Sequence, residues 1–334
     1  MTDVTELVGS DLDLVAEEIR SGDRFLLTTH ENPDGDALGS LLAMNRLLTA
    51  LGKDSVMFLL AKEFPLPVEY RFLPLEEVFH EPPADMSDRV VIFLDCGNID
   101  RMPVDFLQDG ANKVINIDHH HDNTRFGTIN LVDVEASCTA EILYELIGLL
   151  GVELTSEMAN ALYVALVTDT GKFMYENTDA RSHRMAAGLI EAGVKVNEVY
   201  RRLYEHAPLE KLKLLARALE GIELRDDGVL AVTYISKDDY TATGSSEPLT
   251  EGIIDHLRTL DGTAVAAVVR DQAESGQKQR KVSMRSTDGR VDVSAIARVQ
   301  GGGGHRRAAG FGTDDPYEQI VEFLLAQIDA QLKS

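Results

Sequence analysis

Apolar runs that end at a carboxylate or an imidazole constrain the fold of this chain more than any other feature. The runs at 25–27, 90–94 and 114–117 show almost no polar alternation, which is typical of parallel strands buried on both faces. A fourth run, 161–168, fits either such a strand or a buried helix. Burying an unpaired charge is costly, so acidic residues repeated at the ends of buried segments indicate a shared site.

The spacing of these runs predicts an α/β protein of two domains. The first, over 10–190, would hold a largely parallel sheet flanked by helices. A helical linker at 191–224 would lead to a smaller α/β domain at 225–334. We expect strands at 24–29, 55–60, 90–95, 113–118, 229–235, 264–270 and 280–286. Helices are expected near 37–51, 137–150, 156–168, 179–192, 249–260, 292–299 and 315–332. The proline-rich stretch 63–83 is expected to be an exposed insertion or the edge of a lid.

The turn after the first apolar run carries one imidazole and two carboxylates, from His30, Asp34 and Asp36. Pro33 stiffens this turn and Gly35 permits unusual backbone angles. In open α/β sheets, ligands bind at the carboxyl ends of the strands, where these side chains would lie. The turn therefore suggests part of a cation site. The alternative is an Asx-rich turn that caps the following helix, with Asp36 as the N-cap.

Later segments add ligands of the same kinds. The candidate metal ligands are His30, Asp34, Asp36, Asp95, His119 and Asp169. Mixed carboxylates and imidazoles favour Mn²⁺, with Mg²⁺, Co²⁺ or Fe²⁺ also suited, and no thiolate set for structural zinc is present. Two such ions about 3.5–4 Å apart can hold a hydroxide and both oxygens of a phosphoryl displacement. The pattern predicts phosphoester hydrolysis by a two-metal hydroxide mechanism.

A second chemical signal is the run of four glycines at 301–304. Such a run alone is more often a flexible turn than a site. Here it follows Arg285 and precedes His305, Arg306 and Arg307, which favours a loop whose N–H groups clamp a phosphate. It is not a Walker loop, because no Gly-Lys-Ser/Thr sequence closes it.

Taken together, the motifs resemble the DHH phosphoesterases, a family named for the triplet at 118–120. The resemblance rests on His-x-Asn-Pro-Asp-Gly-Asp at 30–36, on Asp95, on the triplet followed by Asn123, and on Asp-Thr-Gly at 169–171. Residues 301–311 resemble the glycine-rich signature of the DHHA1 substrate domain. The whole is similar to the compact NrnA-like branch, bifunctional oligoribonucleases and phosphatases of 3′-phosphoadenosine-5′-phosphate (pAp).

The resemblance implies a role for each candidate residue. One metal would be held by His30, Asp34 and Asp95, and the second by Asp36, Asp95, His119 and Asp169, with Asp95 bridging. The implied catalytic residues are His120, facing the scissile phosphate, and Asp118, orienting an imidazole from behind. The implied substrate-binding residues are Arg285, Gly302, Gly303, Gly304, His305 and Arg306. Relatives commonly show an Asn where this chain has Arg307.

The resemblance also implies where the active site lies, which would be in the cleft between the domains. Short RNA oligonucleotides, pAp or dinucleotides would be its substrates.

Charge and composition limit which substrates and which cellular location fit this activity. A net charge of −24 disfavours long nucleic-acid polymers, which are usually gripped by broad basic surfaces. Residues 270–307, however, hold nine Lys or Arg against four Asp or Glu, which suits a short substrate. An acidic host proteome would explain the charge equally well. Two cysteines form no disulfide framework and no apolar stretch reaches about 20 residues, so a cytoplasmic enzyme that does not span the membrane is expected. A homodimer is compatible with the sequence.

Other functions are weighed against this one. The main alternative is a phosphodiesterase for a cyclic dinucleotide such as c-di-AMP, or for linear pApA. A family II inorganic pyrophosphatase would lack the glycine-rich signature, and a RecJ-type exonuclease would be longer, with a more basic channel. A non-catalytic nucleotide sensor is disfavoured because all six candidate ligands are present. Glu141 is expected either to face the site or to lie on a solvated helix face.

Overall fold

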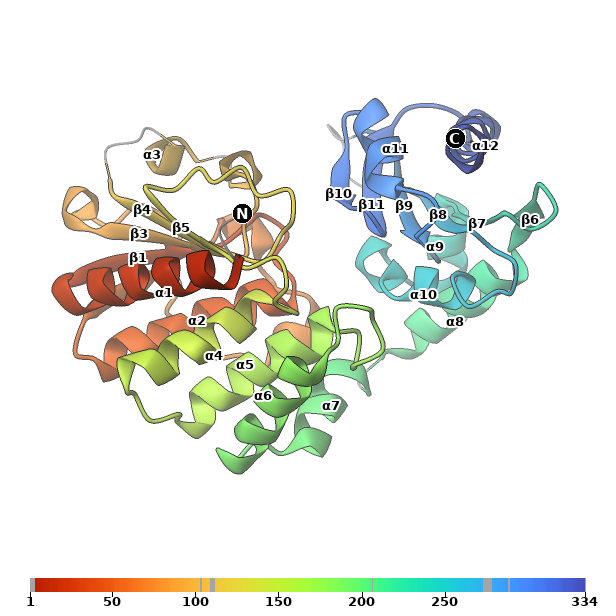
Figure 1. Ribbon diagram of the computed structural model, residues 1–334. Coiled ribbons are helices and arrows are strands. Elements are labelled where there is room, and N and C mark those ends of the chain that lie inside the picture. Colours follow the sequence, from red (N-terminus) through yellow and green to blue (C-terminus); the bar gives the residue numbers. More distant parts are fainter. Residues whose placement is uncertain are drawn as a thin grey trace. The chain divides into compact units, whose positions relative to one another are not determined.

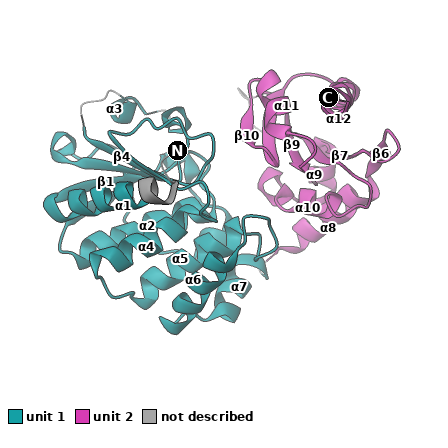
Figure 2. Ribbon diagram, viewed as in Figure 1, with its two compact units in different colours: residues 1–206 teal, residues 207–334 magenta. Residues whose placement is uncertain are grey.

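The structure is a computed structural model that describes residues 4–333 except 103, 109–111, 206, 273–277 and 288, with only the backbone described for 4–8. The chain divides into two compact units, Met1–His206 (unit 1) and Ala207–Ser334 (unit 2), coloured separately in Figure 2. The division falls inside the segment 191–224 that the sequence assigned to a helical linker. That segment contains α7 (Val196–Tyr204) and α8 (Leu209–Glu220).

Unit 1 is built on a five-stranded sheet in the order β2-β1-β3-β4-β5, and every neighbouring pair is parallel. Its strands are β1 (Arg24–Thr28), β2 (Asp54–Met57), β3 (Val90–Leu94), β4 (Val114–Asp118) and β5 (Ile129–Val132). The sequence missed β5, a four-residue edge strand with a polar Asn130 among its apolar residues. The predicted α/β class is confirmed.

The long helices cover one face of this sheet, and the short helix α3 (Asp105–Gln108) lies on the other, as Figure 1 shows. The helices of unit 1 besides α7 are α1 (Val4–Ser21), α2 (Gly35–Ala50), α3 (Asp105–Gln108), α4 (Thr139–Leu150), α5 (Ser156–Asp169) and α6 (Ala180–Glu191). Leu27 and Ile92 pack in the core formed with α2, α4 and α5, whereas Leu26 and Val91 pack on the opposite face with Leu107 of α3. Alternate residues of each strand are therefore buried on opposite faces, which explains the unbroken apolar runs. The ambiguous run 161–168 is helical and lies in α5.

Helices α2 and α5 pack closely and run in opposite directions. Gly39 makes this approach feasible, because a side chain there would collide with the carbonyl oxygen of Ala161. Gly35, at the start of α2, packs in the same way against Thr168, near the end of α5. The first turn of α2 and the last turn of α5 consequently meet at the same end of the unit.

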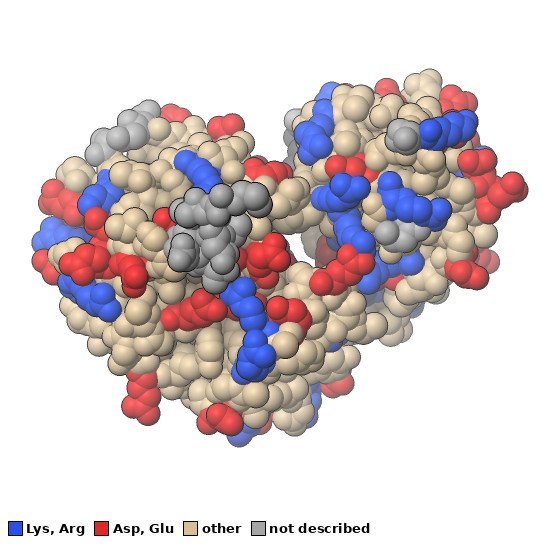
Figure 3. Space-filling model, viewed as in Figure 1, with Lys and Arg blue, Asp and Glu red and all other residues tan. Residues whose placement is uncertain are grey.

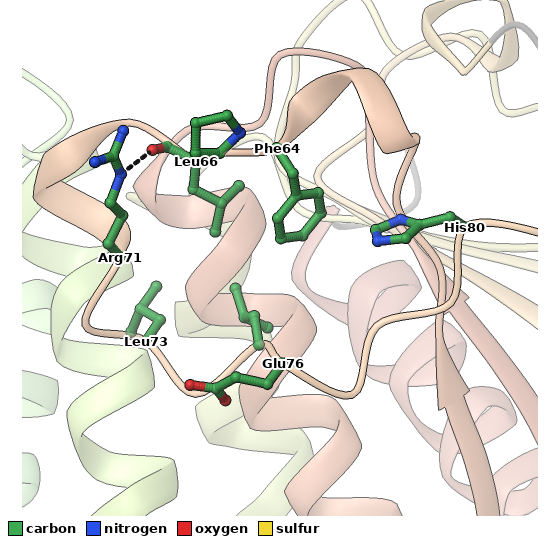
Figure 4. Close-up of a pocket in the computed structure, with 8 residues that line it drawn as sticks. Phe64, Leu66, Arg71, Leu73, Glu76 and His80 are labelled. Carbon is green, nitrogen blue, oxygen red and sulfur yellow. Dashed lines mark hydrogen bonds between the residues drawn. The ribbon is translucent and has the colours of Figure 1, made fainter.

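The proline-rich insertion forms short 3₁₀ turns rather than a regular element. These turns are η1 (Ala61–Glu63) and η2 (Val68–Tyr70), and η3 (Met86–Asp88) and η4 (Ile99–Arg101) follow on either side of β3. The insertion surrounds a cavity of about 300 Å³ (Figure 4). The residues that line it are Phe64, Pro65, Leu66, Arg71, Leu73, Leu75, Glu76 and His80. At its edge the Arg71 Nε donates to the Leu66 carbonyl at 2.7 Å. None of the lining residues is a candidate metal ligand.

Unit 2 contains a six-stranded sheet in the order β10-β11-β9-β8-β7-β6, in which only β7 and β8 pair in parallel. Its strands are β6 (Glu223–Arg225), β7 (Leu230–Ile235), β8 (Val265–Asp271), β9 (Arg280–Ser286), β10 (Gly303–His305) and β11 (Ala308–Thr313). Its other helices are α9 (Lys237–Thr243), η5 (Glu247–Thr250), α10 (Ile253–Leu257), α11 (Val293–Val299) and α12 (Tyr317–Leu332). The glycine-rich segment is therefore partly a β-hairpin and not only a loop. No helix of the described residues is both long and apolar enough to cross a lipid bilayer.

Candidate metal centre

The carboxyl ends of three adjacent strands bring the first candidate ligands together. His30 follows β1, Asp95 follows β3 and His119 follows β4, and these strands are neighbours in the sheet. The strand order reverses between β1 and β3, which is where open α/β sheets of this order bind ligands. His30 and Asp95 flank that point.

The turn between β1 and α2 supplies two carboxylates with different local roles. Asp34 is the N-cap of α2, and its Oδ1 accepts hydrogen bonds from the N–H groups of Asp36 and Ala37, both at 3.1 Å. The alternative in which Asp36 is the N-cap of this helix is wrong, because Asp34 takes that position. Asp36 lies in the first turn of the helix and is 1% exposed, whereas Asp34 is exposed.

All six candidate ligands gather in one cluster. Their ligating atoms fall in overlapping groups within 4.8 Å, namely His30 with Asp34 and Asp95, Asp36 with His119 and Asp169, and Asp95 with His119 and His120. The Oδ2 of Asp95 lies 3.6 Å from the Nε2 of His30, and its Oδ1 lies 3.6 Å from the Nε2 of His119. One carboxylate thus presents an oxygen to each side of the cluster, as a bridging ligand would.

Both imidazoles of the cluster turn the same nitrogen inward. The Nδ1 of His30 donates to the Glu31 carbonyl at 2.7 Å, and the Nδ1 of His119 donates to the Ala136 carbonyl at 3.3 Å. A carbonyl can only accept, so Nδ1 carries a proton, and Nε2 is the nitrogen whose lone pair can face a metal once that nitrogen is deprotonated. Hydrogen bonding of the outer nitrogen is the usual arrangement around a metal-binding histidine.

The pKa shifts within the cluster indicate that its buried carboxylates are suited to binding cations. Burial raises the pKa of Asp36 well above 3.8, and the charges of Asp95 and Asp169 raise it further. Burial also raises the pKa of Asp169, to about 7. Burial would lower the pKa of His119, but Asp169, Asp95 and Asp36 outweigh it and raise the value to about 10. So many carboxylates in one buried place are costly unless positive charge offsets them, and oxygen with imidazole nitrogen is a donor set for divalent metals.

The backbone is strained beside the cluster. Asn32 and Asp95 adopt left-handed conformations, with φ of 52° and 55°, and so do Lys172 and Phe173, which follow Asp169, with φ of 64° each. Such conformations cost on the order of 1–3 kcal/mol each in residues other than glycine, and they cluster at functional sites. For Asp95 the conformation turns the chain sharply at the end of β3.

A hydrogen-bonded chain fixes the third imidazole, His120. Its Nδ1 donates to Asp118 Oδ1 at 2.7 Å, and the amide of Asn123 donates to Asp118 Oδ2 at 2.5 Å and to Asn116 Oδ1 at 2.7 Å. Burial disfavours the imidazolium form, but the hydrogen bond to Asp118 and the charges of Asp95 and Asp118 raise the pKa of His120 above 6.5. These contacts fix the ring of His120 beside the cluster and favour its imidazolium form.

Several contacts to the ligands come from residues that the sequence did not indicate. The N–H of Thr139 donates to Asp36 Oδ2 at 2.7 Å, and that of Ala140 donates to Asp36 Oδ1 at 3.1 Å. The amide of Asn177 donates to Asp169 Oδ2 at 3.3 Å. Backbone donors leave no mark on a sequence, whereas the asparagine eight residues after Asp169 is a polar residue that the sequence does display.

The candidate substrate residues lie in unit 2. The side of the sheet that carries Arg285 continues across Ala308 to His305, since these residues pair in register on β9, β11 and β10. Arg306 follows β10 and its guanidinium reaches the carbonyl of Gly289 at 3.4 Å. The structure thus aligns Arg285 with His305 but gives Arg306 a local contact.

The glycines of this segment differ in whether internal packing leaves room for a side chain. Side chains at Gly302 and Gly304 would collide with the carbonyl oxygens of Gly310 and Ala308, so packing alone requires glycine there. A side chain at Gly303 would meet nothing within 4 Å among the described residues, and Gly303 is exposed. Gly303 is therefore the one of the three whose missing side chain internal packing does not explain.

Comparison with known proteins agrees with these observations. Residues 24–166 match the DHH family, N-terminal domain, and residues 230–334 match the DHHA1 domain. The chain is 34% identical over 316 residues, 92% of each chain, to the bifunctional oligoribonuclease and PAP phosphatase NrnA of Thermus thermophilus. Its fold resembles an exopolyphosphatase-related protein from Bacteroides fragilis, with a TM-score of 0.86, 21% identity and 98% of each chain covered. It also resembles the exonuclease RecJ bound to manganese, with a TM-score of 0.52, 16% identity and 98% and 94% covered.

The fold and the cluster of carboxylates and imidazoles define a metal-dependent hydrolase of phosphoesters. More specifically, the chain belongs to the DHH family of phosphoesterases and carries the DHHA1 domain of that family. The family expected from the motifs is confirmed. Divalent metal dependence follows from the family and the cluster.

Proposed function

We propose that this protein hydrolyses short oligoribonucleotides to mononucleotides and pAp to AMP, using two Mn²⁺ ions. The single observation that carries the proposal is the convergence of six ligand side chains at the carboxyl edge of the sheet. The bifunctional oligoribonuclease and PAP phosphatase NrnA of Thermus thermophilus, which matches 92% of this chain, supports this substrate class.

The ligand groups suggest how two ions would be held. His30, Asp34 and Asp95 would hold one (site one), and Asp36, His119 and Asp169 would hold the other (site two), with Asp95 shared. When bound, two such ions supply Lewis acidity that activates a water and neutralises phosphoryl oxygens. Hydrolysis adds that water's oxygen to phosphorus and breaks the bond from phosphorus to the 3′ oxygen, which takes up a proton.

His120 has the geometry to act on the phosphate. Asp118 holds the imidazole through Nδ1 and favours the imidazolium form, in which Nε2–H would be a charged donor for a phosphoryl oxygen in the transition state. A donor held in place before the reaction needs no reorganisation during it, which is why such contacts lower barriers. His120 would then be a catalytic residue and Asp118 the residue that positions it.

Unit 2 would hold the part of the substrate that does not react. Arg285 and His305 lie in one row of the sheet, and the bare backbone at Gly303 leaves room for a phosphate or a base. Figure 3 shows Lys and Arg side chains on the visible face of this unit. Since the chain as a whole carries a net charge of −24, a substrate with few phosphates is favoured over a polymer.

A side-by-side assay tests the proposal. The purified protein is given pAp, an RNA dinucleotide, c-di-AMP and pyrophosphate with Mn²⁺, together with the variant Asp95→Ala. We expect turnover of pAp and the dinucleotide, and its loss in the variant and in EDTA. Dominant turnover of c-di-AMP would favour the cyclic dinucleotide phosphodiesterase instead. A folded Asp95→Ala protein that keeps more than about a tenth of the activity would contradict the two-metal assignment.

A further inference from the structure

One short segment contacts three of the four carboxylate and imidazole groups on one side of the cluster directly and reaches the fourth, Asp169, through Asn177. Residues 136–140 (the 136–140 segment) lead into the first turn of α4. The Ala136 carbonyl accepts from His119 Nδ1, and the Ser137 carbonyl accepts from the Asn177 amide, which also donates to Asp169. Asn177 thereby links the 136–140 segment to Asp169.

The other end of the 136–140 segment contacts the two remaining carboxylates. The N–H groups of Thr139 and Ala140 hold both oxygens of Asp36, and the Thr139 Oγ1 donates to Asp95 Oδ1 at 3.2 Å. These N–H groups belong to the first turn of α4, whose N-cap residue Cys138 makes no side-chain cap. Asp36, from another helix, takes that role and also gains from the positive end of the helix dipole.

An ion pair between the buried Glu141 and the half-buried Arg181 holds the 136–140 segment in this position. Glu141 is 3% exposed, and its Oε2 accepts from the N–H of Ser137 at 2.8 Å and from its hydroxyl at 2.6 Å. The other oxygen, Oε1, lies 2.9 Å from Nε of Arg181 on α6. Arg181 also reaches Asp133 and Glu145, each at 3.1 Å. Glu141 thus neither faces the cluster nor lies on a solvated surface.

We propose that Glu141 and Arg181 are positioning residues that set the metal affinity of site two, and only of site two. The inference rests on the two ion sites proposed above. Site two consists of Asp36, His119 and Asp169, and the 136–140 segment contacts all of them, two directly and Asp169 through Asn177. Site one shares only Asp95 with this network, through the hydroxyl of Thr139.

Site one has independent supports. His30 is fixed by the carbonyl of Glu31, its neighbour, and Asp34 is fixed by N–H groups of α2. None of these contacts passes through α4 or α6. Loosening the 136–140 segment should therefore disturb the geometry of one site and leave the other nearly unchanged. Loss of such outer contacts typically weakens metal affinity by 10- to 100-fold.

The variant Glu141→Gln tests this with little change of shape. A glutamine cannot satisfy both neighbours, because its oxygen can face either Ser137 or Arg181, and its NH₂ then faces a donor on the other side. The matched control is Glu157→Gln. Glu157 also forms an ion pair, with Arg46 at 2.9 Å. It lies on α5, twelve residues before Asp169, which corresponds to about 18 Å along the helix axis.

The two sites are isolated by removing one ligand at a time. Asp34→Asn leaves site two, and it preserves the cap of α2 because Asn caps as well as Asp does. Asp169→Asn leaves site one. Mn²⁺ dissociation constants are then measured by electron paramagnetic resonance of the free ion, with no activity assay. Circular dichroism and thermal unfolding in EDTA establish that each variant is folded.

The expected result is asymmetric. In the Asp34→Asn background, Glu141→Gln should weaken Mn²⁺ binding 10- to 100-fold, and Glu157→Gln should change it less than threefold. In the Asp169→Asn background, Glu141→Gln should also change it less than threefold. Equal weakening at both sites, or none at site two, in folded protein would overturn the inference. If Glu141→Gln does not fold, Ser137→Ala, which removes the hydroxyl contacts to Glu141 and to the Cys138 sulfur, must show the same asymmetry with a smaller weakening of Mn²⁺ binding.

The outcome is separable from that of the proposed function. A wild-type protein that binds one Mn²⁺ or none would contradict the two-metal proposal itself. A wild-type protein that binds two ions but does not hydrolyse pAp would leave the positioning role of Glu141 intact.

Discussion

Replacing Asp118 by asparagine removes one charge without changing the shape of the side chain. In the native chain the two oxygens of Asp118 accept from His120 and from Asn123. Asn123 cannot turn its amide over freely, because its NH₂ also donates to Asn116 at 2.7 Å. An asparagine at 118 would therefore keep its oxygen toward Asn123 and present NH₂ to His120.

The imidazole must then change its protonation state. The Nδ1 of His120 would have to accept the new hydrogen bond, which a protonated imidazole cannot do, so the ring would be held neutral. A hydrogen bond to a charged group contributes about 1.5–3 kcal/mol, and loss of that contribution in the transition state corresponds to roughly a 10- to 150-fold lower kcat. KM should change little, because His120 would act on the phosphate in the transition state rather than in substrate binding.

The assay is kcat and KM for pAp between pH 6 and 9 with saturating Mn²⁺. The charges and hydrogen bond that raise the pKa of His120 stabilise its charged form, so activity that needs this form is lost as pH rises through that pKa. In Asp118→Asn the loss should begin at lower pH. Asp122→Asn, an exposed acid in the same loop, is the control and should behave as wild type. Unchanged kcat, or a fall caused by lost Mn²⁺, would refute the role given to Asp118.

Three further predictions follow from the charges. In metal-free protein the pKa of His119 is raised to about 10 and that of Asp169 to about 7, so Mn²⁺ must displace protons. The affinity for Mn²⁺ should therefore rise with pH, by up to tenfold per pH unit for each proton displaced. Calorimetry in buffers of different ionisation enthalpy measures the number of protons released. An affinity that does not change with pH would contradict the assignment of His119 and Asp169 as metal ligands. Hydrolysis per RNA end should fall steeply beyond a handful of nucleotides, and a 24-mer cut as fast as a dinucleotide would show the charge argument to be wrong. Arg285→Ala or His305→Ala should lower kcat/KM for pAp about 10- to 100-fold but leave bis-p-nitrophenyl phosphate hydrolysis nearly unchanged, and equal loss on both would contradict the division of labour between the units.

The sequence indicated which candidate ligands would gather because several of them end an element with a strong side-chain pattern. Asp95 and His119 follow strands whose residues are apolar on both faces, and Asp169 ends a helix that is buried along most of its length. Periodicity reports burial, and the carboxyl edge of a parallel sheet then brings the ends together without further information. The N-cap position of α2 was misplaced by two residues because Asp34 and Asp36 are equally good caps by type.

What the sequence could not predict depends on backbone direction. The N–H groups of Thr139 and Ala140 become donors to Asp36 only after α2 and α4 have packed together. The strands at 303–305 and 308–313 contain glycines and alanines, whose small side chains give no alternating pattern. Glu141 could not be placed because a helix pattern does not show which neighbour, here Arg181 of α6, packs against it.

The two proposed ion sites also differ in how strongly the protein holds their carboxylates. Both oxygens of Asp36 accept hydrogen bonds from N–H groups of α4, and Ser40 adds a third, so the direction in which it faces a cation is fixed. Asp34 is exposed, and one of its oxygens is engaged in capping α2, which leaves Oδ2 as its ligand atom. A buried, fully oriented ligand loses less entropy on binding an ion than an exposed one does. Site two should therefore bind Mn²⁺ more tightly than site one, and dilution should empty site one first.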